Sequence, residues 1–139
     1  MAGFTLSDLN AQKSMTSQAL QQARHNRTVC LEKIQRLQEA SASLSDSLRN
    51  VQSLKRSIGD FEIGRGDWRG DRKAAFDKKY LVYKNCWLTY YGQVKCSKDL
   101  VDHEIRVIEQ KRALYGSQIA NLQSTLRNIE ANIAKAERE

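Results

Sequence analysis

The hydrophobic residues of this chain recur in heptads over two long stretches. In the first stretch, from Leu6 to Ile58, spacings of three and four alternate without a slip. The pattern predicts one helix over residues 5–58, and Thr5 with Asp8 has the form of a capping box at its start. One seam position of this helix holds Leu9, Thr16, Ala23, Cys30, Leu37, Leu44, Val51 and Ile58, and the other holds Leu6, Lys13, Leu20, Arg27, Ile34, Ser41, Leu48 and Lys55.

A second heptad pattern predicts a helix over residues 71–137. The alternation breaks once, where two spacings of four follow each other around Val101, and such a stutter locally unwinds a supercoil. Residues 59–70 lie between the two patterns and contain four of the seven glycines, so we expect a single turn there. The seam of the second helix runs through Phe76, Tyr80, Tyr83, Trp87, Tyr90, Val94, Ser97, Val101, Ile105, Ile108, Arg112, Tyr115, Ile119, Leu122, Leu126, Ile129, Ile133 and Ala136.

Two long helices joined by one turn fold back on each other as antiparallel neighbours. We therefore expect an all-α, elongated, antiparallel two-helix hairpin that forms a single domain over residues 1–139. If the turn is centred near residue 64, residue i of the first helix faces residue 129 − i of the second. This register leaves the chain beyond about residue 125 overhanging without a partner.

The apolar stripe is wider than a two-helix hairpin buries, because further apolar residues lie beside the seams. We expect this surplus to pack against partner chains and so complete a helical bundle. The residues concerned are Leu31, Leu54, Leu81, Leu88, Val107 and Leu114.

An aromatic cluster in the second helix has two interpretations. The five side chains fill a wide part of the core at helical spacing, or they form a recognition patch, since Tyr and Trp are enriched at interface hot spots. The first helix offers mainly Ser, Leu and Ala opposite them, so both interpretations stay open. The cluster, a candidate partner interface, consists of Tyr80, Tyr83, Trp87, Tyr90 and Tyr91.

Cations alternate with apolar residues at one seam position of the first helix, where Lys13, Arg27 and Lys55 stand. Polar residues in a seam lower stability but select register and partner. We expect these cations to meet carboxylates on a partner helix. The alternative is that their stems lie along the seam while their charged ends reach water.

The net charge of +7 favours an acidic protein partner. Residues 1–58 carry eight Lys/Arg against four Asp/Glu, residues 59–79 six against five, and residues 80–139 nine against seven. By this division the excess is spread over both helices, whereas a nucleic-acid-binding protein usually clusters it on one face or in a tail. We therefore expect no nucleic-acid partner.

No constellation of residues indicates catalysis or a cofactor. The two histidines, His25 and His103, are far apart among polar residues, and no Gly-rich phosphate loop follows a strand. Cys30, Cys86 and Cys96 are odd in number and lack C-x-x-C spacing, so neither a zinc site nor a full disulfide framework is indicated. We interpret them as small buried hydrophobes, and their redox state stays open. We expect a protein that is not an enzyme.

No apolar run approaches the length of a membrane span. The first residues lack the basic and apolar regions of a secretory signal peptide. We expect a cytoplasmic protein, or one exported by a route that does not read such a signal.

The predicted turn ends in Trp68-Arg69-Gly70, and Ala74 and Phe76-Asp77 follow it. This Trp-x-Gly pattern between two long helices, with a late helix ending in Ile residues, resembles the YwqH-like branch of the Trp-x-Gly superfamily. That superfamily consists of helical hairpins handled by type VII secretion systems. The resemblance implies that Trp68 and Gly70 form the turn motif and that Phe76 anchors the start of the second helix.

The resemblance also implies a function. Members of this branch are encoded beside LXG-type polymorphic toxins in Gram-positive bacteria and are thought to bind the toxin's N-terminal LXG domain, with a second small helical protein, for export. The expected role is thus a targeting adaptor, with the secretion ATPase as a further partner. The alternatives are a generic coiled-coil scaffold or assembly protein and, third, a basic nucleic-acid-associated protein.

The chain departs from smaller superfamily members in its export signal. A Tyr-x-x-x-Asp/Glu signal is not found near the C-terminus, where Tyr115 is followed four residues later by Ile119. Phe4 and Asp8 have the spacing of a related Phe-x-x-x-Asp signal and are the candidate in its place.

Overall fold

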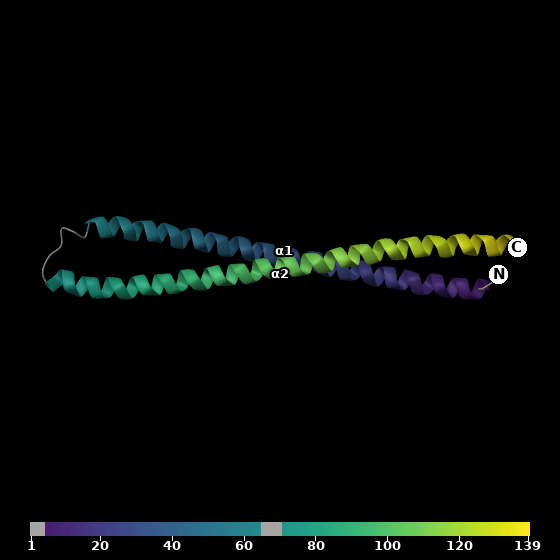
Figure 1. Ribbon diagram of the computed structural model, residues 1–139, viewed down its shortest axis with the longest axis horizontal. Helices are drawn as coiled ribbons and strands as arrows, with labels where there is room; N and C mark the ends of the chain where they lie inside the picture. The colour runs from purple at the N-terminus through teal and green to yellow at the C-terminus, as the bar shows by residue number, and fades with distance from the viewer. Residues whose placement is uncertain (1–4, 65–70) are drawn as a thin grey trace. The chain divides into compact units, whose positions relative to one another are not determined.

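The protein folds into two helices. The structure is a computed structural model that describes residues 5–64 and 71–139, and the side chains of these residues except 58–64, 71 and 72. Helix α1 spans Leu6–Gly64 and helix α2 spans Asp71–Arg138 (Figure 1). No strand occurs in the described part of the chain. The prediction of an all-α two-helix hairpin is confirmed.

The start of α1 is fixed by the predicted capping box. The backbone N–H of Asp8 donates to Thr5 Oγ1 over 3.1 Å, and the backbone N–H of Thr5 donates to Asp8 Oδ2 over 3.3 Å. The Thr5 carbonyl then accepts the first helical hydrogen bond from Leu9. Two of the N–H groups that a helix start leaves unpaired are thereby satisfied.

The end of α1 differs from the prediction. The sequence pattern placed the end of this helix at residue 58, but α1 continues to Gly64. One glycine at residue 59 costs a helix only about 1 kcal/mol relative to alanine, and no proline follows to stop it. The predicted turn over residues 59–70 therefore begins too early, and its remaining residues, 65–70, lie outside the described part.

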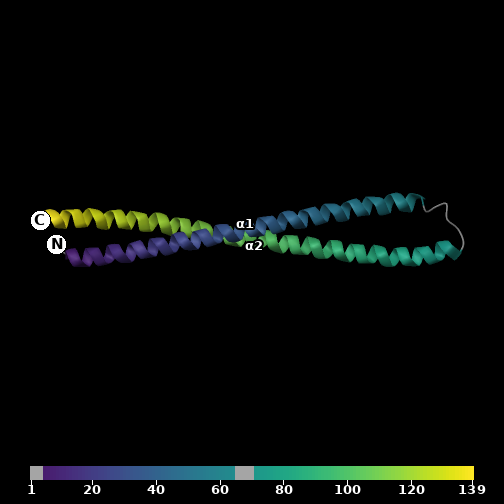
Figure 2. The same cartoon turned by 180° about the vertical axis from the view of Figure 1, so that it is seen from behind.

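The chain divides into two compact units, each of which pairs a piece of α1 with a piece of α2. The terminal unit consists of Met1–Gln35 and Arg106–Glu139. Within it, both ribbon views show the purple start of α1 beside the yellow end of α2 (Figures 1 and 2). Two apolar clusters hold these pieces together in antiparallel order: Leu9 with Ile129, Ile133 and Ala136, and Leu20 and Ala23 with Ile119, Leu122 and Leu126.

The central unit, Arg36–Ile105, is also antiparallel but has a sparser core. Its buried hydrophobic residues are Val51 on α1 and Trp87 and Val94 on α2, among the side chains described. A hydrogen bond from Ser41 Oγ to Asp102 Oδ1, 2.6 Å long, also joins the two helices there. Within this unit, residue numbers thus rise along α1 as those of their α2 partners fall.

The register of the helices differs from the predicted one. Val51 contacts Trp87, whereas the expected register placed it opposite residue 78. Leu9 packs on Ile129 and Ile133, so the end of α2 is covered and the predicted overhang is wrong. The cause is the late end of α1: because this helix continues to Gly64, the chain folds back later and each α1 residue meets a later part of α2.

The hydrophobic seams of the heptad pattern correctly locate the core. Every buried hydrophobic residue among the described side chains stands at one of the predicted seam positions. These residues are Leu9, Leu20, Ala23, Cys30, Ile34 and Val51 on α1, and Trp87, Val94, Ile108, Ile119, Ile129 and Ile133 on α2.

Candidate partner-binding surface

Trp87 belongs to the core of the central unit. Its side chain is 8% exposed, and its indole Nε1–H donates to the backbone carbonyl of Val51 over 3.0 Å. The indole also stacks on Tyr91, with ring centroids 5.8 Å apart. Within the predicted aromatic cluster, this residue therefore joins the two helices, and its burial counts against direct contact with another chain.

The other aromatic residues of α2 differ in their exposure. Tyr80 is half-buried and stacks on Phe76, with ring centroids 5.9 Å apart. Phe76, which the family resemblance made an anchor of this helix, thus has an aromatic neighbour one turn further on. Tyr83 and Tyr90 are 49% and 51% exposed, although both stand at predicted seam positions. Of the cluster, these two tyrosines are the ones that present most surface to a partner.

Exposed hydrophobic residues concentrate around these tyrosines. Five large exposed hydrophobics fall within ten consecutive residues of α2: Leu81, Val82, Tyr83, Leu88 and Tyr90. Leu54 of α1 is a sixth in the central unit and Leu100 a seventh. Single exposed hydrophobics are ordinary on protein surfaces, but a run of them indicates a binding surface. Val82 and Leu100 were not foreseen, because they lie outside both the seam and its flanks.

The three seam cations, Lys13, Arg27 and Lys55, are exposed. The Lys13 ammonium lies 3.9 Å from a carboxylate oxygen of Glu130, so its carboxylate partner is on α2 of the same chain. Both side chains are about half exposed, and such pairs contribute little stability. Arg27 lies in the terminal unit with Lys13, whereas Lys55 lies in the central unit.

A polar cluster that the sequence did not reveal joins the helices of the central unit. Asp102 accepts a hydrogen bond from Ser41 through Oδ1, and its Oδ2 lies 2.7 Å from the Lys98 ammonium. All three side chains are half-buried. Ser41 stands in the polar seam, so the pairing that this seam selects includes a contact inside the hairpin. Its one sequence signal was a small hydroxyl residue at a seam position.

Cysteines and histidines do not form a metal site in the described residues. The structure contains no group of three or more His, Cys, Asp or Glu side chains in that part of the chain that could hold a metal ion. All three cysteines are free thiols. Cys30 is buried as expected, but Cys86 and Cys96 are exposed, so the interpretation as small buried hydrophobes is wrong for these two.

Comparison of the chain with models of protein families identifies its family. The model described as YwqH-like matches residues 11–138, which include nearly all of both helices. The chain belongs to the YwqH-like family. No curated protein and no solved structure matches the chain.

Membership of the YwqH-like family places the candidate residues in context. The matched range includes Trp68 and Gly70, but these two residues lie outside the described part of the structure. It excludes Phe4 and Asp8, the candidate export signal. Phe4 also lies outside the described residues, while the Asp8 carboxylate accepts the capping hydrogen bond from Thr5. Asp8 therefore has a structural role that explains its presence without an export signal.

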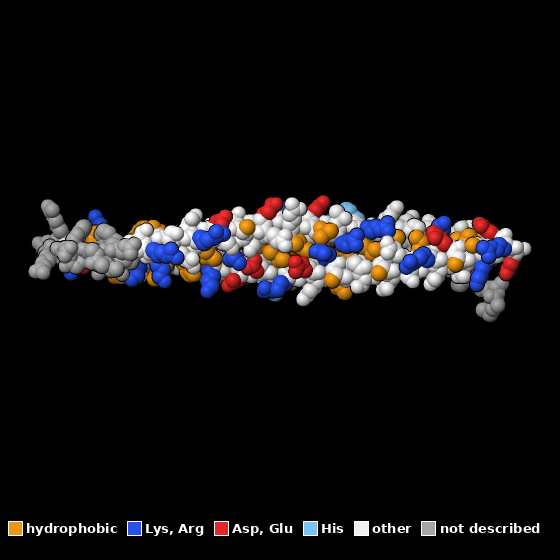
Figure 3. Space-filling view, turned by 90° about the horizontal axis from the view of Figure 1, so that it is seen from above, with side chains coloured by type: hydrophobic (Ala, Val, Ile, Leu, Met, Phe, Trp, Pro, Cys, Tyr) orange, Lys and Arg blue, Asp and Glu red, His pale blue; other side chains and the backbone are white. Residues whose placement is uncertain are grey.

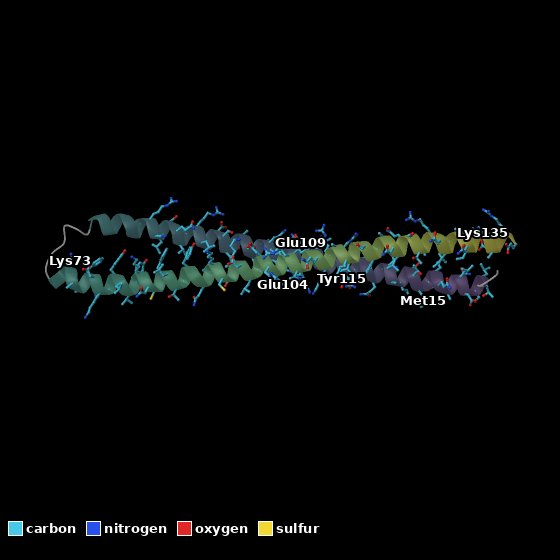
Figure 4. All side chains as sticks on the ribbon, in the orientation of Figure 1. Met15, Lys73, Glu104, Glu109, Tyr115 and Lys135 are labelled. Atoms are coloured by element: carbon cyan, nitrogen blue, oxygen red, sulfur yellow. The ribbon has the colours of Figure 1, made fainter. Side chains whose placement is uncertain are left out.

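In the described residues, neither helix contains a stretch long and apolar enough to cross a bilayer. On the face drawn in Figure 3, hydrophobic side chains lie among Lys and Arg side chains. Met15, labelled in Figure 4, is an exposed hydrophobic residue of the terminal unit and has 71% of its surface exposed.

Proposed function

We propose that this protein is a non-enzymatic targeting adaptor of a type VII secretion system. In this proposal it binds the helical N-terminal LXG domain of a polymorphic toxin in the cytoplasm, together with a second small helical protein, and promotes the toxin's export. The secretion ATPase would then receive the assembled complex.

One observation carries the proposal: this YwqH-like hairpin leaves many large hydrophobic residues of its central unit exposed. Seven large hydrophobic residues are exposed there, against three buried ones, among the described side chains. Exposed apolar patches of this kind are typical of protein interaction sites, and helices bind such surfaces through their own apolar stripes. A helical toxin domain has the secondary structure to present such apolar stripes.

The runner-up function, a generic coiled-coil scaffold, differs in its partner. A scaffold would bury the same surface against further copies of this chain and would form larger assemblies as its concentration rises. The net charge of +7 opposes such self-association, because like-charged copies repel each other.

The decisive experiment measures toxin export with and without this protein. The gene is deleted in a strain that secretes an LXG toxin encoded beside it, and the toxin is quantified in the culture supernatant and in the cells. We expect secreted toxin to fall sharply and to recover when the wild-type gene is restored. Unchanged secretion in the deletion strain would exclude the adaptor role.

A binding experiment with purified components complements the genetic one. The LXG domain and this protein are co-expressed, and their co-elution is followed by size-exclusion chromatography with light scattering. An LXG domain from an unrelated locus serves as the control. Co-elution with the cognate domain alone supports the proposal, whereas a homo-oligomer that excludes the cognate domain supports the scaffold.

A further inference from the structure

One side of the central unit combines aromatic, aliphatic and basic side chains. On α2, residues 79, 83, 86 and 90 follow one another at spacings of four, three and four, so they share one side of the helix. Val82 lies beside them, four residues before Cys86, and is 64% exposed. We name this surface the aromatic flank; its α2 residues are Lys79, Val82, Tyr83, Cys86 and Tyr90.

Helix α1 contributes Leu54 to the same flank. Val51 and Trp87 face each other across the seam. In an antiparallel pair, the residues three positions after two such core partners lie on the same side of the pair, because a twofold axis relates them. These residues are Leu54 and Tyr90, 40% and 51% exposed.

The opposite side of α2 is built differently. Leu88 follows Trp87 by one residue and therefore lies about 100° further around the helix axis. Tyr90 lies on the other side of Trp87, so Leu88 and Tyr90 face opposite sides of the helix. Lys95 lies seven residues further and shares the side of Leu88. Leu88 is 49% exposed, the same fraction as Tyr83. The two sides thus offer matched pairs of residues, one on the aromatic flank and one off it.

The segment of α2 that carries this flank is strongly basic. Residues 73–98 contain six lysines and a single acidic residue, Asp77, giving +5 of the total of +7. Summing charge over residues 59–79 and 80–139 hides this run, because the division cuts it in two and acidic residues on either side balance the sums. Lys73, labelled in Figure 4 near the start of α2, is its first member.

An open groove lies at the N-terminal end of the flank. Among the described residues, Lys78, Lys79 and Val82 line it, and its surface is mainly apolar, because the methylene stems of the lysines contribute to it. An apolar side chain that enters this groove would have two ammonium groups beside it. The groove therefore suits a segment with hydrophobic residues next to carboxylates.

We propose that the aromatic flank docks an amphipathic helix whose apolar stripe covers Leu54, Tyr83 and Tyr90 and whose carboxylates meet Lys78 and Lys79. The proposal rests on the adaptor function above and names the chemistry of the partner's contacting segment. A second copy of this chain is a poor occupant, because both copies would bring residues 73–98, with a net charge of +5, to the interface. The absence of arginine from residues 73–98 disfavours nucleic acid, whose phosphates arginine binds in bidentate geometry.

Fluorescence anisotropy on the full chain tests this directly. The probe is a labelled synthetic peptide of three heptads with Leu at its seam positions and Glu on both sides of the seam; a second peptide has Lys in place of Glu. We expect the acidic peptide to bind and the basic one to bind at least tenfold more weakly. Tyr83→Ser and Tyr90→Ser should each weaken binding of the acidic peptide about tenfold or more.

Matched variants on the other side of α2 serve as controls. Leu88→Ser removes a side chain as exposed as Tyr83 and should change binding less than about twofold. Lys79→Glu should weaken the acidic peptide and strengthen the basic one, whereas Lys95→Glu should do neither. Circular dichroism of every variant checks that helix content is retained.

Several results would overturn the proposal. Equal effects of Tyr83→Ser and Leu88→Ser would mean that the flank is not the site. The flank would belong to another occupant if phosphatidylglycerol vesicles or duplex DNA bound more tightly than the acidic peptide and lost binding in Tyr90→Ser. The same holds if the protein self-associated and Tyr90→Ser abolished this self-association.

The toxin's LXG domain separates this proposal from the function on which it rests. If the domain binds wild type and the Tyr83→Ser and Tyr90→Ser variants equally, the flank is wrong and the adaptor function stands. If the domain does not bind at all while the acidic peptide binds through the flank, the adaptor function fails and the surface stands.

Discussion

The two units use one heptad pattern for different ends. Among the described side chains, the terminal unit buries nine hydrophobic residues and exposes four large ones, whereas the central unit buries three and exposes seven. The two units have similar numbers of these hydrophobic residues, but they differ in how many of them are buried. The terminal unit buries most of these hydrophobic side chains between its two helices. The central unit leaves most of its own exposed, where a partner can contact them.

Side-chain shape explains this contrast. In the terminal unit, β-branched Ile119 packs against Leu20 and the small Ala23, which lets the helices interlock. In the central unit, Trp87 is buried and bonded to the backbone of Val51, whereas Tyr83 and Tyr90, which occupy the other seam position, stay about half exposed. A seam of large aromatic residues against a helix rich in serine thus yields fewer buried positions and more exposed ones.

The strongest test of the contrast is Trp87→Ala. Because the central unit has so few buried residues, loss of this side chain and its hydrogen bond to Val51 should cost about 3–5 kcal/mol. Hydrogen exchange followed by mass spectrometry should show faster exchange at residues 36–57 and 73–105, while residues 6–35 and 106–138 keep their protection. The control Leu88→Ala, at a half-exposed position, should stay within about 0.5 kcal/mol of wild type.

The reciprocal change is Ile119→Ala in the terminal unit. Ile119 is 5% exposed and contacts Leu20 and Ala23, so the substitution should cost about 2–5 kcal/mol through lost burial and a residual cavity. Exchange should then accelerate in the terminal unit, and binding of the acidic peptide should be unchanged. Leu114→Ala, at a 65% exposed position in the same unit, is the matched control. A common loss of protection in both units after either change would show that they unfold together.

The sequence predicted the angular position of side chains better than their depth. The heptad pattern identified every buried hydrophobic position among those described, because helical spacing alone fixes which side chains point to the partner helix. Depth depends on the residue opposite, and therefore on register. Register depends on where the turn begins, and the pattern placed the end of α1 at residue 58 and not at Gly64.

The candidate site was predicted only in part for the same reason. Tyr83 and Tyr90 share one seam position, seven residues apart, and Trp87 stands at the other, but the pattern assigned both positions to the core and did not tell which of them would be exposed. The basic run over residues 73–98 is legible in the sequence but disappears when charge is summed over longer segments. The Ser41–Asp102 hydrogen bond requires the true register and could not be derived without it.

The smallest expected effect concerns the Lys13–Glu130 pair of the terminal unit. The ammonium and carboxylate are 3.9 Å apart and about half exposed, so water and salt screen their attraction. A double-mutant cycle with Lys13→Ala and Glu130→Ala should give a coupling energy of about 0–0.5 kcal/mol in urea unfolding, and smaller still in 1 M salt.

If the terminal unit serves packing and the central unit recognition, Lys13→Ala should also leave binding of the LXG domain unchanged, while Lys79→Glu weakens it. The hypothesis that seam cations select the partner makes the opposite prediction for Lys13, namely weaker binding to the cognate domain and poorer rejection of an unrelated one. A competition pull-down between cognate and unrelated LXG domains decides between them, because loss of selectivity in Lys13→Ala would place a recognition element in the terminal unit and end the division of labour between the two units.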